Sequence, residues 1–263
     1  MQADGYHIFI SNHIYNTRPM GFYLPMTPGL PAVAAALCLS TAALVTAGCA
    51  TTTSGTAAPA PAPPMTTAET LPALLLSAAD VGSALSASDM AVTSDVTKPW
   101  NDSAHFTADS GAAGCLAVAG AAQQGVYAES GWTALHGQVL REPPTAQAWS
   151  HYAVQAVVLF PSTQAATDFF ARSTDSWAGC SNRELAYAQQ LAPDQLWSIG
   201  STTTDSGVLA VSRVQRGPQQ WSCQRALTVH GTVGVDVEAC SLDGPTVAAA
   251  WIAQAIAGRL PGA

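Results

Sequence analysis

Apolar residues recur with two different spacings along most of the chain, and the spacing separates helices from strands. Spacings of three and four positions predict helices over residues 70–85, from Ser162 to about Trp177, and from Gly244-Pro245 onward. Ser162 can cap the second helix, because its hydroxyl can accept a hydrogen bond from a free amide of the first turn. The residues that we expect to pack inward in the last helix are Val247, Ala248, Trp251, Ile252, Ala255, Ile256 and Leu260.

Alternating or short apolar runs predict the strands. The strand-like segments are 132–140, 152–160, 197–199, 208–215, 222–229 and 233–239. Both faces of segment 152–160 are largely apolar, which is typical of a central strand. Helices that interrupt hairpin-connected strands predict an α+β fold, with a mainly antiparallel twisted sheet flanked by helices.

The last two strands predict their own register. Gly231-Thr232 lies between them, and a two-residue turn with glycine first is typical of a type II′ hairpin. Counting outward from that turn places Cys223 opposite Cys240 as a non-hydrogen-bonded pair, with Cα atoms about 4.5 Å apart. A disulfide can span this distance, so the register predicts a cross-strand bridge.

Four of the six cysteines lie after residue 100. An even number in an exported domain indicates two disulfides. The four include no C-x-x-C pair, which argues against a zinc site or thioredoxin-like redox chemistry. If Cys223 pairs with Cys240, the second bridge joins Cys115 to Cys180.

The same register sorts the charged side chains of the hairpin. Arg225, Asp236 and Glu238 share one face, and Arg225 lies opposite Glu238. The simpler interpretation is a solvent-exposed ion pair that contributes less than about 1 kcal/mol. The alternative is a charged patch in a ligand cleft, for which Arg225, Asp236, Glu238 and the nearby His230 are the candidate ligand-binding residues.

Residues 1–48 have the pattern of an export signal. The apolar run 32–47 is shorter than the roughly 20 residues of a membrane span but suits the core of a signal peptide. It ends in Ala47-Gly48-Cys49, which is similar to the lipobox at which bacterial lipoproteins are cleaved and lipidated, although Thr46 stands where that motif prefers Leu or Val. We predict lipidation of Cys49; an ordinary secretory signal with an incidental cysteine is the alternative.

Residues 49–68 are rich in Ala, Pro and Thr, and this composition predicts an extended linker with a reach of about 50 Å at about 3 Å per residue. The predicted organisation is a lipoprotein signal peptide over 1–48, a lipid-anchored linker over 49–68 and a folded domain over 69–263. The region before the apolar run carries one basic residue, Arg18, so an over-extended start with Met20 or Met26 as initiator is an alternative beginning.

Charge limits the partners. Charged residues make up 10% of the chain, and 9 basic residues face 17 acidic ones, for a net charge of −8. Nucleic-acid binding needs clustered Lys and Arg, so nucleic acid is excluded as a partner. The expected partners are the membrane through the lipid anchor, a small-molecule or cell-wall ligand, and a possible envelope protein.

Six segments in this order resemble the PknH-like extracellular sensor domain family. They are 149–161, 177–180, 223–227 and 235–240, with Leu74-Leu75-Leu76-Ser77 and Val126-Tyr127 before them. The resemblance extends over about residues 70–260. It implies an antiparallel sheet flanked by helices, disulfides from first to second and third to fourth cysteine, and a cleft with a ligand-binding role. The family tends to place asparagines in the last hairpin turn, where this chain has His230-Gly231-Thr232.

In mycobacteria this family occurs as the outer domain of a receptor serine/threonine kinase and as free-standing lipoproteins. The resemblance therefore implies a non-catalytic sensor-type domain in the cell envelope, exported and anchored to the outer face of the cytoplasmic membrane. An envelope protein–protein interaction module is the alternative function. The seven tryptophans are expected mainly as core anchors, and several of them could line a cleft.

Catalytic motifs are missing from the sequence: it has no G-x-S-x-G, H-E-x-x-H, P-loop or EF-hand pattern. His105, with Asp102 and Asp109 nearby, is the best candidate for a general base or metal ligand, but a surface histidine in an acidic loop is much commoner. We therefore expect no catalytic residue, no metal and no cofactor. A hydrolase built around His105 is the third and weakest hypothesis.

Overall fold

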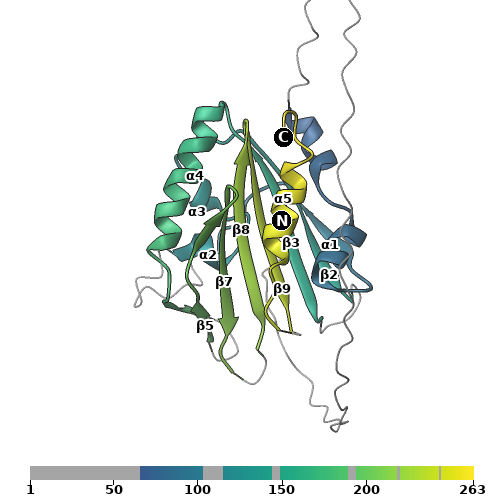
Figure 1. Ribbon diagram of the computed structural model, residues 1–263, viewed down its shortest axis with the longest axis vertical. Helices are drawn as coiled ribbons and strands as arrows, with labels where there is room; N and C mark the ends of the chain where they lie inside the picture. Colours follow the sequence, from purple (N-terminus) through teal and green to yellow (C-terminus); the bar gives the residue numbers. More distant parts are fainter. Residues whose placement is uncertain (1–65, 103–114, 144–148, 189–193, 218–219, 243) are drawn as a thin grey trace, which may run out of the picture. The chain divides into compact units, whose positions relative to one another are not determined.

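The fold is built on one antiparallel sheet of nine strands (Figure 1). The computed structural model describes residues 66–102, 115–143, 149–188, 194–217, 220–242 and 244–263. Its helical elements are the 3-10 helix η1 (Ala68–Leu74), α1 (Ala78–Leu85), α2 (Leu116–Ala119), α3 (Gln124–Tyr127), α4 (Thr163–Ala178) and α5 (Ala248–Ala257). Its strands are β1 (Ala91–Val96), β2 (Ala134–Glu142), β3 (His151–Leu159), β4 (Glu184–Tyr187), β5 (Gln195–Ile199), β6 (Thr203–Asp205), β7 (Val208–Gln215), β8 (Ser222–His230) and β9 (Val233–Ser241).

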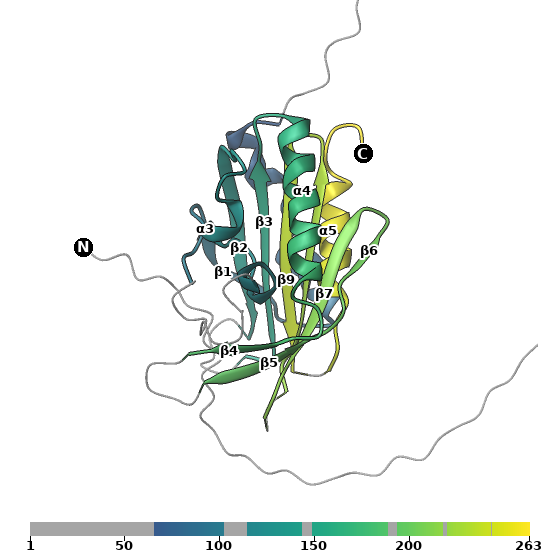
Figure 2. The same cartoon turned by 90° about the vertical axis from the view of Figure 1, so that its left-hand side faces the viewer.

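Helices cover both faces of this sheet. The strand order is β1-β2-β3-β9-β8-β7-β5-β4, and β6 pairs with β7 outside that path. Helix α5 lies over β8 and β9 on one face together with η1 and α1, whereas α4, α2 and α3 lie on the other (Figures 1 and 2). The α+β prediction is confirmed. Strand β3 lies between β2 and β9 and is buried along nearly its whole length, as predicted for a central strand.

The hairpin of β8 and β9 has the predicted register. Its Cα partners include His230 with Val233 at the turn and Cys223 with Cys240 at the far end. Gly231 has φ +58°, which a type II′ turn requires at its first central position. The register prediction is confirmed, because alternation and turn chemistry both act locally.

Both pairs of cysteines form disulfides. Cys223 and Cys240 are bonded with a Cα–Cα distance of 4.0 Å, and Cys115 and Cys180 with one of 5.7 Å. The first bridge joins neighbouring strands. The second joins the residue before α2 to a residue just after α4, so it ties two helices that lie on the same face of the sheet.

Helix α4 begins where it was predicted to begin. The Ser162 hydroxyl accepts a hydrogen bond from the Ala165 amide at 3.1 Å, and Phe169 and Trp177 are buried against the sheet. None of the helices in the described ranges is both long and apolar enough to cross a membrane.

The prediction of one helix over 70–85 is wrong. The structure has η1 and α1 instead, separated at Leu75-Leu76-Ser77, and Ser77 caps α1. The amide and carbonyl of Leu76 bond the side chain of the fully buried Gln155 on β3, each at 2.9 Å. A helix that continued through Leu76 would use this amide and carbonyl for its own hydrogen bonds, so they could not bond Gln155.

Helix α5 buries a narrower face than predicted. Ala248, Ile252 and Ile256 are fully or almost fully buried, but Val247 is 75% and Trp251 48% exposed. These two residues lie one turn apart, on the side of the helix away from the sheet. The expectation that they pack inward is therefore wrong.

Five short elements had no counterpart in the sequence patterns: α2, α3 and the strands β1, β4 and β6. Strands β1 and β4 are the two ends of the sheet path, and all three residues of β6 are exposed. Edge strands bury little of each face, so the periodicity that identifies a strand is weak in them.

A partly buried Glu–His pair fastens the loop before β1 to the β2–β3 hairpin. Glu142 Oε2 lies 2.5 Å from His151 Nδ1, and Glu142 Oε1 accepts hydrogen bonds from the amides of Ser88 at 2.6 Å and Asp89 at 2.8 Å. Burial acts to raise the pKa of Glu142, but the bonds from Asp89, His151 and Ser88 together hold that pKa below its ordinary value. His151 itself is buried, and its ring is the partner of the Glu142 carboxylate.

The variant Glu142→Gln keeps the shape of this side chain and removes its charge. Since the pKa of Glu142 is lower in the folded than in the unfolded protein, the carboxylate stabilises the fold above about pH 4.3 and loses this effect as the pH falls through the folded pKa. We expect wild type to exceed the variant in free energy of unfolding near neutral pH, and the difference to shrink toward about pH 3. Urea unfolding across this range measures it.

Glu184→Gln serves as the control, because Glu184 pairs with Arg216 at the exposed surface. Its effect should be small throughout the range. A difference between wild type and Glu142→Gln that does not change with pH would contradict the role given to the Glu142 carboxylate.

Candidate functional site

The charged residues of the β8–β9 hairpin lie inside the protein. Arg225 is 1%, Asp236 2% and Glu238 0% exposed. The interpretation as a solvent-exposed ion pair is therefore wrong. The reason is a second layer: α4 and the segment formed by α2 and α3, residues 115–127 (the α2–α3 segment), lie on this face of the sheet (Figure 2).

The ion pairs also differ from the predicted pair. Arg225 and Glu238 are Cα partners across the two strands, but the Arg225 guanidinium bonds Asp236, with Nη2 2.6 Å from Oδ1. Glu238 is paired instead with Arg213 from the neighbouring strand β7. Arg213 was missed in the sequence. Arg213 follows the buried Leu209 and Val211 of β7 at steps of two residues, and this spacing indicates that all three lie on the same face of the sheet.

Both guanidinium groups also bond the backbone of α2. Arg225 Nε donates to the carbonyl of Ala117 at 3.1 Å, and Arg213 Nη1 donates to the carbonyl of Val118 at 2.8 Å. Arg225 donates further to the carbonyl of Val237 on β9. Side chains of the sheet thus act as partners for these two α2 carbonyls. A four-residue helix cannot bond its own last carbonyls, because no further turn follows them.

The two carboxylates bond the backbone on the other side of the same segment. The amide of Ala122 donates to Asp236 at 2.9 Å, and that of Ala121 to Glu238 at 3.4 Å. The Tyr127 hydroxyl donates to Asp236 at 2.5 Å. Burial, and then the charge of Asp236, raise the pKa of Tyr127 well above its ordinary value, so this hydroxyl stays a neutral donor.

Each arginine lies against a tryptophan ring. The Arg213 guanidinium carbon is 4.9 Å from the ring centroid of Trp197, and that of Arg225 is 5.3 Å from the centroid of Trp177. Burial lowers the pKa of Arg213 and Glu238 opposes this shift. The four charges Arg213, Arg225, Asp236 and Glu238, hereafter the charge cluster, form a closed network in which each group has an opposite partner and backbone bonds.

A small cleft opens beside Arg213 and Glu238, between the α2–α3 segment and strands β4 and β5. Its apolar lining includes Ala119, Leu185, Trp197 and the Cys223–Cys240 disulfide. The polar part of its lining comprises Asp102, Gln123, Tyr187, Gln195, Arg213 and Glu238. Two of these are already joined, because the Gln123 amide donates to Asp102 at 2.8 Å.

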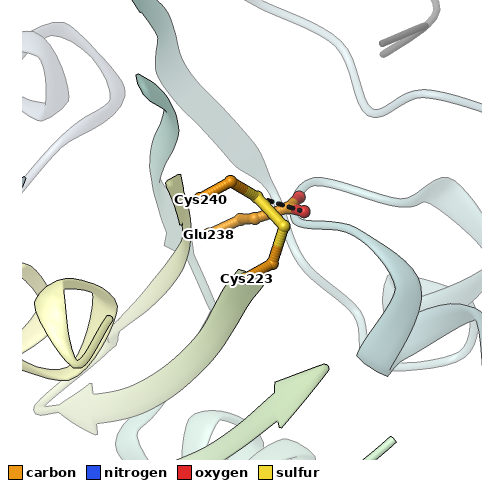
Figure 3. Close-up of side chains that lie close together, drawn as sticks. All are labelled: Cys223, Glu238 and Cys240. Atoms are coloured by element: carbon orange, nitrogen blue, oxygen red, sulfur yellow. Dashed lines mark hydrogen bonds between the residues drawn. A yellow bond between two sulfur atoms is a disulfide. The ribbon is translucent and has the colours of Figure 1, made fainter. Parts of the chain in front are cut away.

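Cys223, Cys240 and Glu238 lie close together at one side of this cleft (Figure 3). Their sulfur and carboxylate atoms lie within 4.8 Å of one another, and Cys240 Sγ is 3.6 Å from Glu238 Oε1. Thiolates and a carboxylate at this spacing are metal-ligand chemistry. The two sulfur atoms are bonded to each other, however, so neither can act as a thiolate ligand or as a hydrogen-bond donor to Glu238.

His230 is separate from the other three candidate residues. It lies at the opposite end of β8, about 23 Å from Cys223 at about 3.3 Å per residue. There it lines a groove with Phe160 and Leu260, and its Nε2 donates to the carbonyl of Pro261 at 3.2 Å. Arg225, Asp236 and Glu238 thus come together and His230 does not join them. His105 and Asp109 lie outside the described residues.

Comparisons with known proteins agree with this architecture. The family model described as "PknH-like extracellular domain" matches residues 66–259. The chain is 32% identical over 179 residues to the serine/threonine-protein kinase PknH of Mycobacterium bovis and to that of Mycobacterium tuberculosis. The aligned part is 68% of this chain and 29% or 28% of the kinases, so the chain spans less than a third of their length.

A solved structure covers the same region. The crystal structure of the extracellular domain of PknH from Mycobacterium tuberculosis superposes with a TM-score of 0.68 at 29% sequence identity. The superposition covers 75% of this chain and 97% of that chain. The similarity is therefore to the extracellular part of the kinase.

The charge cluster gives a stability prediction with a control in the same chain. Asp236→Ala leaves Arg225 and the Tyr127 hydroxyl without their acidic partner in the interior, and we expect a loss of about 3–5 kcal/mol in the free energy of unfolding. Glu184→Ala breaks the exposed pair with Arg216 and should cost less than about 1 kcal/mol. Urea unfolding measures both. Equal losses would contradict the distinction between the buried and the exposed pair.

Proposed function

This chain belongs to the family of PknH-like extracellular domains, and we propose that it is a lipid-anchored envelope protein whose extracellular domain binds a small or cell-wall-derived ligand without catalysing a reaction. The observation that carries the proposal is the cleft beside Arg213 and Glu238. It is preformed, its polar groups converge from β7, β9 and the α2–α3 segment, and its lining combines these groups with apolar side chains. Ligand sites of proteins have this composition.

The residues around the cleft support binding over catalysis. Neither serine nor histidine is among the described residues that line it. Cys223 and Cys240 are bonded to each other, so the described lining also lacks a nucleophilic thiol. Glu238 is held by Arg213 and by the Ala121 amide, so its carboxylate oxygens already have hydrogen-bond partners.

The cleft is built so that a bound ligand would contact the α2–α3 segment. Ala119, Gly120 and Gln123 of that segment line the cleft, and Arg213 and Glu238 both line the cleft and bond the segment's backbone. A ligand that changed these contacts would change how the segment is held. This arrangement suits a sensor, since a ligand in the cleft and the α2–α3 segment would share the same polar groups.

Lipid anchoring is the second part of the proposal. Cys49 stands at the end of a lipobox-like sequence, and the Ala- and Pro-rich residues after it lead to Thr66, the first described residue. An acylated cysteine followed by such a linker would hold the domain near the membrane surface and leave the cleft accessible.

A protein–protein interaction module is the second candidate, and one observation favours it. Val247 and Trp251 are exposed side by side on α5, on the face of the sheet opposite the cleft. Tryptophan is strongly enriched at the centre of protein interfaces. Binding of an envelope protein that is lost in Trp251→Ala but kept in a cleft variant would favour this function.

Filling the cleft tests ligand binding. Gly120 lines the cleft in extended backbone geometry, and a Cβ atom there would meet only Gln123 at 3.4 Å and Glu238 at 3.6 Å. Gly120→Met should therefore fold and occupy the cleft. Thermal-shift screening against envelope lipids, glycans and muropeptides should find a ligand that raises the Tm of wild type and not that of Gly120→Met.

Gly258→Met, at the end of α5 and away from the cleft, is the matched control and should respond like wild type. A ligand that stabilises Gly120→Met as well as wild type would place binding elsewhere. No stabilisation by any compound would contradict the proposed ligand-binding role.

Replacing the predicted lipidated residue tests the anchor. Cys49→Ser removes the thiol that lipidation requires, so the full chain should move from the membrane fraction to the soluble fraction. The control Cys38→Ser changes a cysteine inside the apolar run 32–47 and should leave the distribution unchanged. Membrane association that persists in Cys49→Ser would contradict lipidation at this residue.

A further inference from the structure

We propose that the face of the sheet that carries α5 is an interface between two copies of this chain. This face lies opposite the cleft, so the inference does not depend on ligand binding there. It is derived from the positions of the exposed apolar side chains, from the part of the sheet beside α5, and from the charge of the chain.

The exposed apolar side chains of the described residues gather on this face. Five large hydrophobic residues are exposed, and the four that form the α5 patch are between 40% and 75% exposed: Leu196, Val214, Val247 and Trp251. Leu196 and Val214 belong to this face because side chains alternate along β5 and β7, and their neighbours Trp197 and Arg213 line the cleft on the other face. Single exposed apolar residues are common, but a group of four on one face indicates a contact surface.

The α5 patch includes a strip of the sheet beside the helix. Helix α5 lies over β8 and β9, with α1 on one side of it and β7 on the other (Figure 1). The Ala250 amide in its first turn donates to the side chain of Gln224 on β8, and Gln224 is the Cα partner of Ser212 on β7. Val214 comes two residues after Ser212, and Leu196 lies on β5, the next strand of the sheet. Strands β7 and β5 therefore run beside the first turns of α5, and these three side chains are exposed there.

Trp251 lies on the side of α5 that faces this strip. Ala253 is fully buried in the same cluster as Val81 and Leu85 of α1, so the Ala253 side of the helix faces α1. Successive residues of a helix are turned by about 100°. Trp251 comes two residues before Ala253 and therefore points to about the opposite side, toward β7. Val247, one turn before Trp251, shares that side. The α5 patch thus combines a protruding helix side with a flat, exposed strip of the sheet.

The shape of the α5 patch is self-complementary. A two-fold axis parallel to the strands would bring α5 of each copy over β7 and β5 of the other copy. Each contact made by one copy is then also made by its partner, which is the condition for a closed dimer. Such a dimer needs the protruding side and the strip on the same face, whereas a different partner would need only one of them.

Charge also favours a second copy. The chain has a net charge of −8, so two copies repel each other unless they meet through a face without unpaired charges. None of the four residues of the α5 patch is charged, and Arg216, two residues after Val214, is paired with Glu184. A membrane surface fits less well, because apolar side chains that enter a bilayer surface are usually accompanied by free Lys and Arg.

Sedimentation velocity of residues 66–263 between about 10 µM and about 1 mM tests the proposal. This part contains every helix and strand of the described ranges and both disulfides, and it matches a solved chain that consists of the extracellular domain alone. We expect a weak, reversible monomer–dimer equilibrium, because the α5 patch has only four large apolar side chains. In NMR spectra over the same range, the indole N–H of Trp251 and the amides of Val214 and Leu196 should shift with concentration.

Charged variants identify the surface that makes the contact. Trp251→Glu on the helix and Val214→Glu on the strip should each weaken association about tenfold or more, because a carboxylate would be buried in the interface. Val92→Glu makes the same change at the fifth exposed hydrophobic residue, on the edge strand β1, and should associate like wild type. All three side chains are exposed, so the fold should be kept, and the Tm checks this. Leu196→Glu is the second strip variant if Val214→Glu lowers the Tm.

A mixture of two variants tests the two-fold arrangement. Trp251→Glu and Val214→Lys should each associate poorly alone. When they are mixed, one contact joins opposite charges and the symmetry-related contact is unchanged, so association should recover about tenfold.

A protein that stays monomeric over the whole range would overturn the proposal. Dimers that form equally well in Trp251→Glu and in Val214→Glu would also overturn it, because the contact would then lie elsewhere. Binding to vesicles of phosphatidylglycerol and phosphatidylcholine that is lost in Trp251→Glu, without self-association of wild type, would assign the α5 patch to a membrane surface instead. A mixture that does not recover association would contradict the two-fold arrangement.

Discussion

The burial of two arginines and two carboxylates on one face of the sheet is the constraint on which the rest of this face depends. Removing such charges from water costs several kcal/mol for each ion, and the cost is recovered only when every group has an opposite charge and further hydrogen bonds. Arg213, Arg225, Asp236 and Glu238 meet this condition only because the backbone of the α2–α3 segment supplies part of the bonds. The charge cluster of the sheet and the α2–α3 segment therefore stabilise each other.

The α2–α3 segment would not be ordered by its own residues. Its two helices have four residues each, well below the length at which a helix is stable in isolation. It is held by the charge cluster, by the Tyr127 hydroxyl and by the Cys115–Cys180 bridge to the end of α4. Most of these contacts are polar and directional, so the segment has one well-defined position, and that position forms a wall of the cleft.

Local patterns in the sequence predicted the register of the hairpin, the disulfides and helix α4, because alternation, turn geometry and capping depend on neighbouring residues. Burial of Arg225 and Glu238 could not be predicted in this way, since it depends on a segment about a hundred residues earlier that covers them. The exposure of Trp251 was missed for the converse reason: nothing in the described chain packs over that side of α5. The position of Arg213 could have been predicted, because its two-residue spacing from Leu209 and Val211 places it on the same face of the sheet as Arg225.

The two faces of the sheet differ in a way that explains where a site can form. Beneath α5 the sheet presents Val233, Val235, Val237 and Ala239, which pack against Ala and Ile side chains, and the polar Gln224 of β8 is already bonded by the Ala250 amide of α5 at 3.0 Å. On the other face, the same strand β9 carries Asp236 and Glu238, and the Cys223–Cys240 bridge fixes the two strands at that end. The same polar groups line the cleft and hold the α2–α3 segment, so a ligand in the cleft would meet the groups that position the segment. A ligand that touches Arg213 and Glu238 necessarily acts on the groups that keep the segment in place.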